Sequence, residues 1–352
     1  MAYTDILLTT YPAHKSRNVG DALIAHSAMR LIKARNPQFA PLTLFREASL
    51  ENYDQGQIKN IIAPGFSISP STYPDLYRLY NNLENMPAFF PIGCSFQNVS
   101  PTAFTTVEYD KKTLEVLNFL TAKFGPLPCR DQLIVNMLNR FNVPAVYSGD
   151  LALFDEEYLH KPFIPPSPIR SIVMTLQHHP KYQEQSLRLL HLIRQIFPQA
   201  DLFVSMHSKP NPMMNFIAEE AEKIGYSTLR LSGNVDNLDQ YNPMDLHIGY
   251  RLHGHIAFLR KRKASILLVE DARGFGFART AGTSHGCFPA FLFDSFAADY
   301  SILDCVKNFL ARQIEENFEG YKSLFNFLDK TYKEFIDPYF AKIAHRVGMG
   351  NC

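Results

Sequence analysis

The chain has 352 residues, 46% of them hydrophobic and 20% charged, and its 35 lysines and arginines nearly balance 34 aspartates and glutamates, giving a net charge of +1. This composition excludes an intrinsically disordered chain, and the balanced charge argues against non-specific nucleic-acid binding and against a polybasic membrane anchor. The length predicts about two domains, each large enough to bury its own hydrophobic core.

Five cysteines, scattered and never arranged as C-x-x-C, are Cys94, Cys129, Cys287, Cys305 and Cys352. An odd, dispersed set predicts buried reduced thiols rather than a disulfide framework or a zinc site. The first residues lack the basic start and apolar run of a signal peptide, and no segment reaches the roughly 18 consecutive apolar residues of a membrane span. We therefore expect a cytoplasmic protein with no integral membrane segment.

The first half of the chain alternates short apolar segments with amphipathic ones. Strands are predicted at Asp5–Thr9, Leu42–Phe45, Asn60–Pro64, Ala88–Ile92 and Ala145–Ser148. Helices are predicted between them, at Asp21–Arg35, Pro74–Asn85, Asp110–Lys123 and Asp131–Phe141. Strands that alternate with helices of this length indicate βαβ units and a parallel sheet.

A proline-rich segment follows this first half. Four of the eight residues from Lys161 to Pro168 are proline, which excludes a helix or a central strand and predicts a linker. The alternation then resumes, with strands predicted at Ser171–Leu176, Asp201–Met206, Ser227–Leu231, Asp245–Ile248 and Ser265–Val269. The helices of this second half are predicted at Lys181–Phe197, Pro210–Ile224 and Leu252–Lys261.

We therefore predict an α/β protein with two Rossmann-like domains facing a cleft, at residues 1–160 and 169–300, joined by the linker 161–168. Residues 301–352 are expected to form a mostly helical tail, rich in Phe and Tyr, that packs back on the body. Ligands of such sheets bind beyond the carboxyl ends of the strands. Four motifs in the sequence are predicted to lie at those ends.

The first motif, Arg17-Asn18-Val19-Gly20-Asp21, follows the first strand and opens a helix. Gly20 lets the backbone approach a ligand closely, and the amide groups at a helix start favour an anion. Asp21 is a candidate to orient a sugar hydroxyl or to act as an acid or base. The alternative is that Asp21 only caps the helix.

The second motif is Cys129-Arg130-Asp131-Gln132, followed about twenty residues later by Gly149-Asp150. Arg130 is a candidate phosphate-binding fork, because its planar guanidinium matches that geometry. Asp131 is predicted to cap the next helix, and Asp150 comes directly after a strand. The alternative for this pair of segments is a local ion pair plus a cap.

The third motif, Arg251-Leu252-His253-Gly254-His255, runs from a strand into a helix. Arg251 suits a carboxylate or phosphate, and His253 can donate or accept a proton near neutral pH. Gly254 leaves room for a ligand beside the backbone, whereas His255 is expected to face the core. This motif carries the functional prediction more strongly than the others.

The fourth motif, Glu270-Asp271-Ala272-Arg273-Gly274-Phe275-Gly276, follows the last predicted strand and could add a second cation, Arg273, on a flexible turn. Its spacing fits neither G-x-G-x-x-G nor a Walker sequence. His178, His179 and His207 also follow strands and are weaker cleft candidates. No carboxylate or cysteine stands at metal-ligand spacing from them, so no metal is expected.

Taken together, the ordered set Asn18-x-Gly20-Asp21, Arg130-Asp131, Gly149-Asp150 and Arg251-Leu252-His253-Gly254 resembles the polysaccharide pyruvyl transferase family, over roughly residues 5–282. The resemblance implies a fold similar to the two-domain GT-B glycosyltransferase arrangement. It also implies transfer of the pyruvyl group of phosphoenolpyruvate to two hydroxyls of a sugar as a cyclic ketal. Two segments depart from the family's pattern: Ala63-Pro64-Gly65-Phe66 replaces a run of glycines, and Arg273 replaces a common lysine.

By this resemblance the first domain is the acceptor side and the second the donor side, with phosphoenolpyruvate as donor and no cofactor. The acceptor is a sugar of a cell-surface polysaccharide or its precursor, and a lipid-linked acceptor would bring the protein to the inner face of the membrane. The candidate catalytic residues are His253 and Asp21. The candidate substrate-binding residues are Arg251, Leu252, Gly254, Arg130, Arg273, Asn18, Gly20 and His207.

Two other functions stay open at this point. The fold also suits a GT-B glycosyltransferase that uses a nucleotide sugar, although the Glu-x7-Glu pair of many such enzymes does not occur in this sequence. The other is a catalytically silent binding homologue: the altered segment Ala63–Phe66 favours it, and the presence of Arg251 and His253 argues against it.

Overall fold

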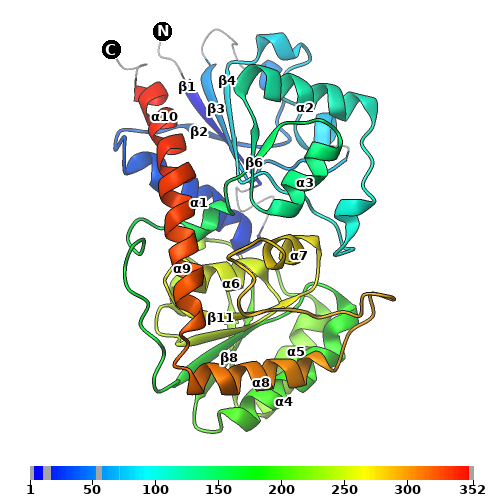
Figure 1. Cartoon of the computed structure of the whole chain (residues 1–352), viewed down its shortest axis with the longest axis vertical. Helices are drawn as coiled ribbons and strands as arrows, with labels where there is room; N and C mark the ends of the chain where they lie inside the picture. Colours follow the sequence, from blue (N-terminus) through cyan, green and yellow to red (C-terminus); the bar gives the residue numbers. More distant parts are fainter. Residues whose placement is uncertain (1–3, 11–16, 53–57, 71, 349–352) are drawn as a thin grey trace.

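The structure is a computed structural model that describes residues 4–10, 17–52, 58–70 and 72–348. Two α/β halves lie one above the other in Figure 1, and a helical tail runs along one side of both. The paired strands of each half are all parallel, as the alternation of strands and helices predicts. None of the helices in the described part of the chain combines the length and apolarity that a membrane crossing requires.

The N-terminal half is built on a four-stranded sheet in the order β2-β1-β3-β4. Its strands are β1 (Thr4–Thr9), β2 (Leu42–Phe45), β3 (Ile58–Pro64) and β4 (Ala88–Ile92), and β5 (Leu127–Cys129) and β6 (Ala145–Tyr147) pair beside them. A single bridge between Cys94 and Cys129 joins the two sheets. The helices of this half are α1 (Val19–Lys33), α2 (Lys111–Phe124) and α3 (Gln132–Arg140).

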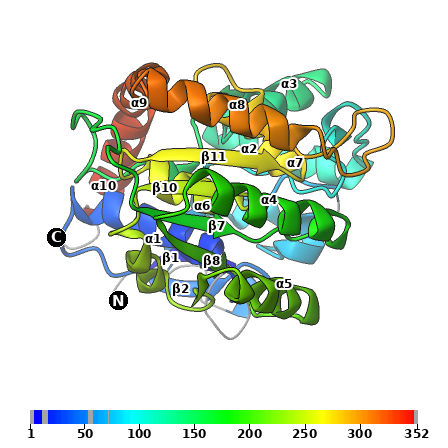
Figure 2. The same ribbon diagram turned by 90° about the horizontal axis from the view of Figure 1, so that it is seen from below.

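The C-terminal half has one six-stranded sheet in the order β12-β11-β10-β7-β8-β9. Its strands are β7 (Ser171–Thr175), β8 (Asp201–Met206), β9 (Tyr226–Arg230), β10 (Leu246–Gly249), β11 (Ala264–Val269) and β12 (Cys287–Pro289). Its helices are α4 (Gln183–Ile196), α5 (Pro212–Lys223), α6 (Leu252–Leu259) and α7 (Ala272–Ala278). Figures 1 and 2 show α4 and α5 on the outer side of the sheet, while α6 and α7 lie on the side that faces the N-terminal half.

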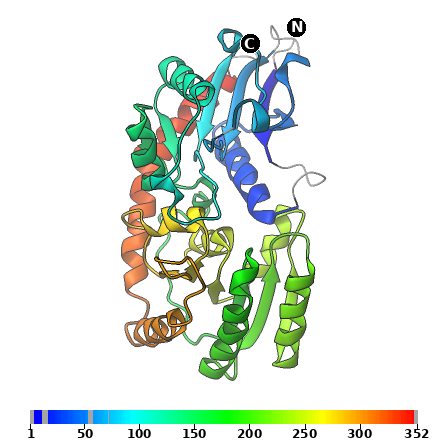
Figure 3. The ribbon, with the colours of Figure 1, turned by 90° about the vertical axis from the view of Figure 1, so that its right-hand side faces the viewer.

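The tail consists of α8 (Ile302–Glu315), α9 (Gly320–Thr331) and α10 (Asp337–Gly348). The phenol of Tyr321 in α9 donates a hydrogen bond to the carbonyl of Ser265, at 2.7 Å, in the C-terminal half. Tyr339 in α10 donates one to the carbonyl of Pro91, at 2.6 Å, in the N-terminal half. The column of α9 and α10 therefore contacts both halves, as Figure 3 shows along its left side.

Several local predictions are wrong. The predicted helix Pro74–Asn85 is replaced by two short turns, Thr72–Leu76 and Leu83–Asn85, because Leu79 between them has a positive φ of 43° that no α-helix accommodates. The predicted flexible turn at residues 270–276 is in fact the start of α7, whose N-cap Asp271 accepts a hydrogen bond from the amide of Gly274. The short strands β5 and β12 were not predicted, and each contains a proline.

Candidate active site between the two halves

A cavity of about 790 Å³ opens between the two halves. Its walls come from the ends of β1 and β2 and the start of α1 in one half, and from segments after β7, β8, β10 and β11 in the other. This is the edge at which parallel sheets bind ligands. The charged and imidazole side chains of its lining are Arg17, Asp21, Arg46, Glu47, His178, His179, Lys209, Arg251, Asp271 and Arg273.

Arg251 is the N-cap of α6 and is buried in the cavity wall. Its amide donates to the Thr175 hydroxyl at 3.1 Å, which fixes the backbone at the end of β7. Its guanidinium reaches Nδ1 of His178 at 3.2 Å and the hydroxyl of Ser208 at 3.4 Å. Burial lowers the pKa of Arg251, and Glu270 opposes that shift. An arginine keeps its charge even so, and the result is a fixed cation with few competing partners.

Arg273 is a second cation, held by Asp271 through two hydrogen bonds of 2.8 and 2.6 Å. Burial alone would raise the pKa of Asp271, but Arg273 outweighs it and the net value falls to about 2. The neighbouring Glu270 accepts the amides of His178 and His179 at 2.8 and 3.1 Å. Burial and the charge of Asp271 raise the pKa of Glu270 to about 7.

His253 lies in the first turn of α6, with its Nε2 3.6 Å from Oδ2 of Asp150. Both side chains are buried, and neither atom has a hydrogen-bond partner among the described residues. The other oxygen of Asp150 accepts the amide of Ala152 at 3.0 Å. Burial would raise the pKa of Asp150, but His253 and then Arg130 lower it overall, so the carboxylate is ionised.

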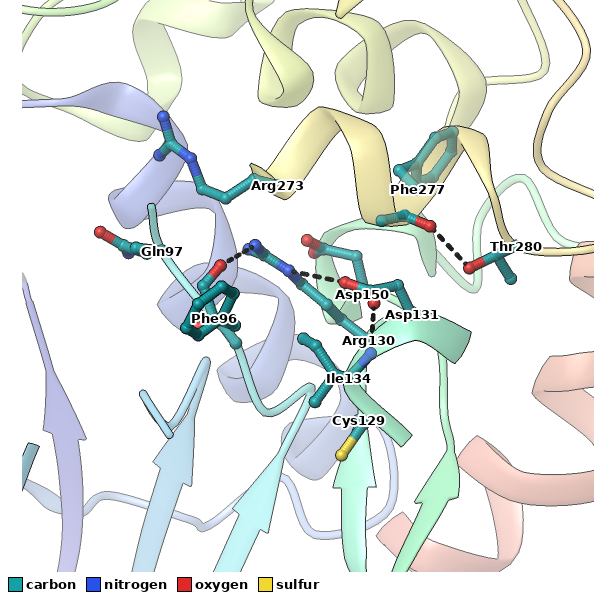
Figure 4. A network of polar contacts seen from close by, with 12 residues as sticks. Phe96, Gln97, Cys129, Arg130, Asp131, Ile134, Asp150, Arg273, Phe277 and Thr280 are labelled. Carbon is teal, nitrogen blue, oxygen red and sulfur yellow. Dashed lines mark hydrogen bonds and ion pairs between the residues drawn. The ribbon is translucent and has the colours of Figure 1, made fainter. Parts of the chain in front are cut away.

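Arg130 lies close to Asp150 in the N-terminal half, as Figure 4 shows. Its Nη2 donates to the carbonyl of Phe96 at 3.1 Å, and its Nε lies 3.7 Å from Oδ2 of Asp131. Asp131 caps α3 through the amide of Ile134, and burial raises its pKa to about 6. A small space beside the main cavity is lined by residues of both halves, among them Asp21, Arg130, His253 and Arg273.

The start of α1 packs directly against the C-terminal half. Asn18 caps the helix by accepting the amide of Gly20 at 3.1 Å, and the amide of Val19 donates to the carbonyl of His207 at 2.9 Å. A β-carbon on Gly20 would lie 2.5 Å from Nδ1 of His253. Glycine is therefore required here because the backbone of one half rests on the imidazole of the other.

The structure brings most of the predicted site residues together. Asn18, Asp21, Arg251 and Arg273 line the main cavity, and Arg130 and His253 line the small space beside it. The other four, Gly20 among them, line neither space. Leu252 is buried, Gly254 packs on Thr175 and His247, and His207 is held by the hydroxyl of Tyr241 at 2.7 Å. Burial holds the pKa of His207 well below its usual range, so it is a neutral packing residue at the back of the site.

Other lining residues were not predicted. Arg46 and Glu47 follow β2, and Ser208 and Lys209 follow β8, so each pair stands directly beyond the carboxyl end of a strand. The sequence held a signal for them, because β2 and β8 were both predicted and the residues that follow a parallel strand are candidates for a ligand site. Asp150 was noted only as a residue at a strand end, since nothing in the sequence pairs it with His253.

The fold defines a class of protein: two Rossmann-like halves with a cavity between them, the GT-B-like arrangement. A putative UDP-N-acetylglucosamine 2-epimerase from Listeria monocytogenes superimposes with a TM-score of 0.50, at 11% identity, over 92% of this chain and 91% of that one. The UDP-GlcNAc 2-epimerase from Neisseria meningitidis gives 0.49, at 10% identity, over 99% and 100%. A Streptococcus pneumoniae structure of accessory secretory proteins 1, 2 and 3 gives 0.47, at 13% identity, over 92% of this chain but only 57% of that one.

The sequence identifies the family of the chain, which the fold alone does not. A family model described as polysaccharide pyruvyl transferase matches residues 18–271, well over half of the chain. The chain belongs to the polysaccharide pyruvyl transferase family. No curated protein matches it in sequence. The matched segment runs from Asn18 to Asp271 and includes every predicted site residue except Arg273.

Substituting Gly20 by alanine tests the contact between the halves. The added methyl group would overlap the His253 ring, which must move or push α1 away. We expect transfer activity to fall by about 10²-fold, because a displacement of about 1 Å at a reacting group has that effect. Steady-state rates measure the loss of activity, and thermal unfolding measures how far the displacement of His253 or α1 destabilises the fold.

Gly274→Ala, whose β-carbon would meet Val269 at an ordinary 3.4 Å, is the matched glycine control. Unchanged activity in Gly20→Ala would show that the observed contact of α1 with His253 is not the catalytic arrangement.

Proposed function

We propose that the protein transfers the pyruvyl group of phosphoenolpyruvate to two hydroxyls of a sugar in a cell-surface polysaccharide or its precursor, forming a cyclic ketal. The observation that carries the proposal is the position of His253. It is paired with buried Asp150 and shares one space with Asp21, Arg130 and Arg273. The family membership of the chain supports the same reaction class.

Phosphoenolpyruvate carries a carboxylate and a phosphate, and three arginines are available to bind them. Arg251 and Arg273 lie in the cavity wall and Arg130 in the adjoining space, so cations approach from both halves. Arginine forks match both anionic groups in bidentate fashion. Burial strengthens these contacts because little water competes with them.

The reaction needs one proton at C3 of the enol and the loss of a proton from each sugar hydroxyl. His253, whose Nε2 lies 3.6 Å from Asp150, is the group we assign to protonate C3, which makes C2 an oxocarbenium-like electrophile. The first hydroxyl then bonds to C2, the C2–O bond to phosphate breaks, and the second hydroxyl closes the ketal. Of the two protons lost, one balances the proton given to C3 and the other leaves with phosphate.

Asp21 is the group we assign to accept a hydroxyl proton. It stands in the first turn of α1 and lines both the main cavity and the adjoining space, which it shares with His253. The halves meet at Gly20, directly against His253, and we assign to this contact the exclusion of water from the electrophile. Water at C2 would release pyruvate instead of ketal.

Titration of phosphoenolpyruvate into the protein, compared with UDP and GDP, tests the donor. We expect saturable binding of phosphoenolpyruvate and none of either nucleotide. Addition of a sugar acceptor should then give inorganic phosphate and a ketal methyl signal in the proton NMR spectrum in equal amounts. Binding of a nucleotide alone would instead assign the protein to the nucleotide-sugar glycosyltransferases, and binding of none would favour a silent homologue.

A further inference from the structure

A second cavity, of about 230 Å³, lies between the halves at a different place. It is lined by α1, by the 3₁₀ segment Val235–Tyr241, by the end of α6 and by Asp155. The segment Val235–Tyr241 packs on α1, and α1 also contacts α6. Ligand sites commonly form at such junctions between domains.

This cavity is separate from the active site. On α1, Asp21, Ile24 and Ala25 face the active-site spaces, whereas Leu23, His26 and Arg30 line the second cavity. At about 100° per residue these sets occupy opposite faces of one helix. On α6 the active site uses the first turn, and the second cavity uses the last. Figure 1 shows α1 above α6 where the two halves meet.

The charged lining of the cavity is balanced. Three cations (Arg30, Arg260 and Lys261) and three carboxylates (Asp155, Asp236 and Asp239) sum to zero. Several of these are already paired: Arg260 donates to Asp155 at 2.7 Å, and Lys261 lies 3.7 Å from Asp239. A strongly charged ligand therefore has no excess of opposite charge to bind.

The lining nevertheless offers hydrogen-bonding groups. The Nε of Arg260 is buried and has no partner within the part of the chain that the structure describes. Burial, then the charges of Arg260 and Arg30, lower the pKa of His26, so its imidazole is neutral near pH 7 and can donate and accept. The carboxylate of Asp236 adds an acceptor at the exposed rim. Four apolar residues complete the wall: Leu23, Val235, Leu238 and Ala257.

We propose that this cavity binds a neutral, hydroxyl-rich ligand, a single sugar residue of a saccharide. Hydroxyl groups both donate and accept, so they suit a lining of paired charges and a neutral imidazole, and the carbon face of the ring suits the apolar wall. The volume is below the range of about 300–1,000 Å³ that drug-sized ligands occupy, which fits one ring. Because both halves contribute, the bound sugar also stabilises their contact.

Ligand-observed NMR with methyl α-D-mannopyranoside, methyl β-D-galactopyranoside and N-acetylglucosamine tests the site without any donor present. The blocking variant is Val235→Trp. Because the chain contains no tryptophan, a blue-shifted emission from the new indole reports that it fills the cavity. Asp236→Ala removes one acceptor, and Asp294→Ala, at an exposed position outside the cavity lining, is its matched control.

We expect saturable binding of at least one of these sugars to the wild-type protein, at least tenfold weaker in Val235→Trp and weakened in Asp236→Ala. Binding should persist in Asp294→Ala and in Arg251→Ala, whose substitution lies in the active site. Loss in Arg251→Ala with retention in Val235→Trp would place the sugar in the main cavity and overturn the proposal. So would the absence of binding by all three sugars. Neither result depends on phosphoenolpyruvate, so the proposed donor is tested separately.

Discussion

Replacement of His253 by alanine is expected to lower the turnover number for ketal formation by about 10²–10⁴-fold, the usual contribution of a positioned general acid. The imidazole lies 3.6 Å from an ionised, buried carboxylate, Asp150, and beside the arginines that we assign to the donor. Its removal takes away the proton for C3 and leaves the cations in place. The dissociation constant of phosphoenolpyruvate should therefore change only severalfold.

Single-turnover kinetics and calorimetric titration separate the two effects. His191→Ala, at an exposed position on α4, is the matched control and should behave as wild type. Comparable loss of binding and turnover in His253→Ala would mean that the imidazole binds the donor rather than protonating it. Full activity would remove His253 from the mechanism altogether.

The fold was largely predictable because its signals are local. A buried parallel strand is a short apolar run, and the helices that cover it alternate with it, so Ala88–Ile92 and Asp201–Met206 were placed correctly. Failures occurred where local and tertiary preferences differ. The segment from Thr72 to Asn85 has the apolar spacing of a helix. In the structure Tyr77 and Tyr80 are both buried in the core, and Leu79 between them has a left-handed backbone conformation that interrupts a helix.

The site was predictable only in its members, not in their pairing. Strand ends point to Asp21, Arg251 and His253 because parallel strands place their following loops at one edge. The contact of His253 with Asp150 joins residues about a hundred positions apart in different halves, and no pattern in the sequence encodes that distance. Likewise, Gly254 was predicted to make room for a ligand, but the close neighbours of its backbone are Thr175 and His247.

The largest effect on binding is expected from Arg251→Ala. The guanidinium is buried, carries its charge into the cavity, and contacts only His178 and Ser208 through its side chain among the described residues. Loss of a buried cation that binds an anion costs about 2–5 kcal/mol, so the dissociation constant of phosphoenolpyruvate should rise by at least about thirtyfold. Arg251→Lys keeps the charge but loses the fork, and should bind with intermediate affinity.

Isothermal titration of phosphoenolpyruvate into wild type, Arg251→Ala and Arg251→Lys orders the three, with Arg188→Ala on the exposed surface of α4 as the matched control. The ranking of lysine between arginine and alanine matters more than the size of the loss, because a misfolded variant would show no such order.

If Arg251→Ala binds as tightly as wild type, the donor lies nearer Arg130 and Arg273. His253 would still be within reach there, because it lines the same space as both arginines. The two substitutions therefore test different parts of the proposal: Arg251 tests where the anion is held, and His253 tests where its proton comes from.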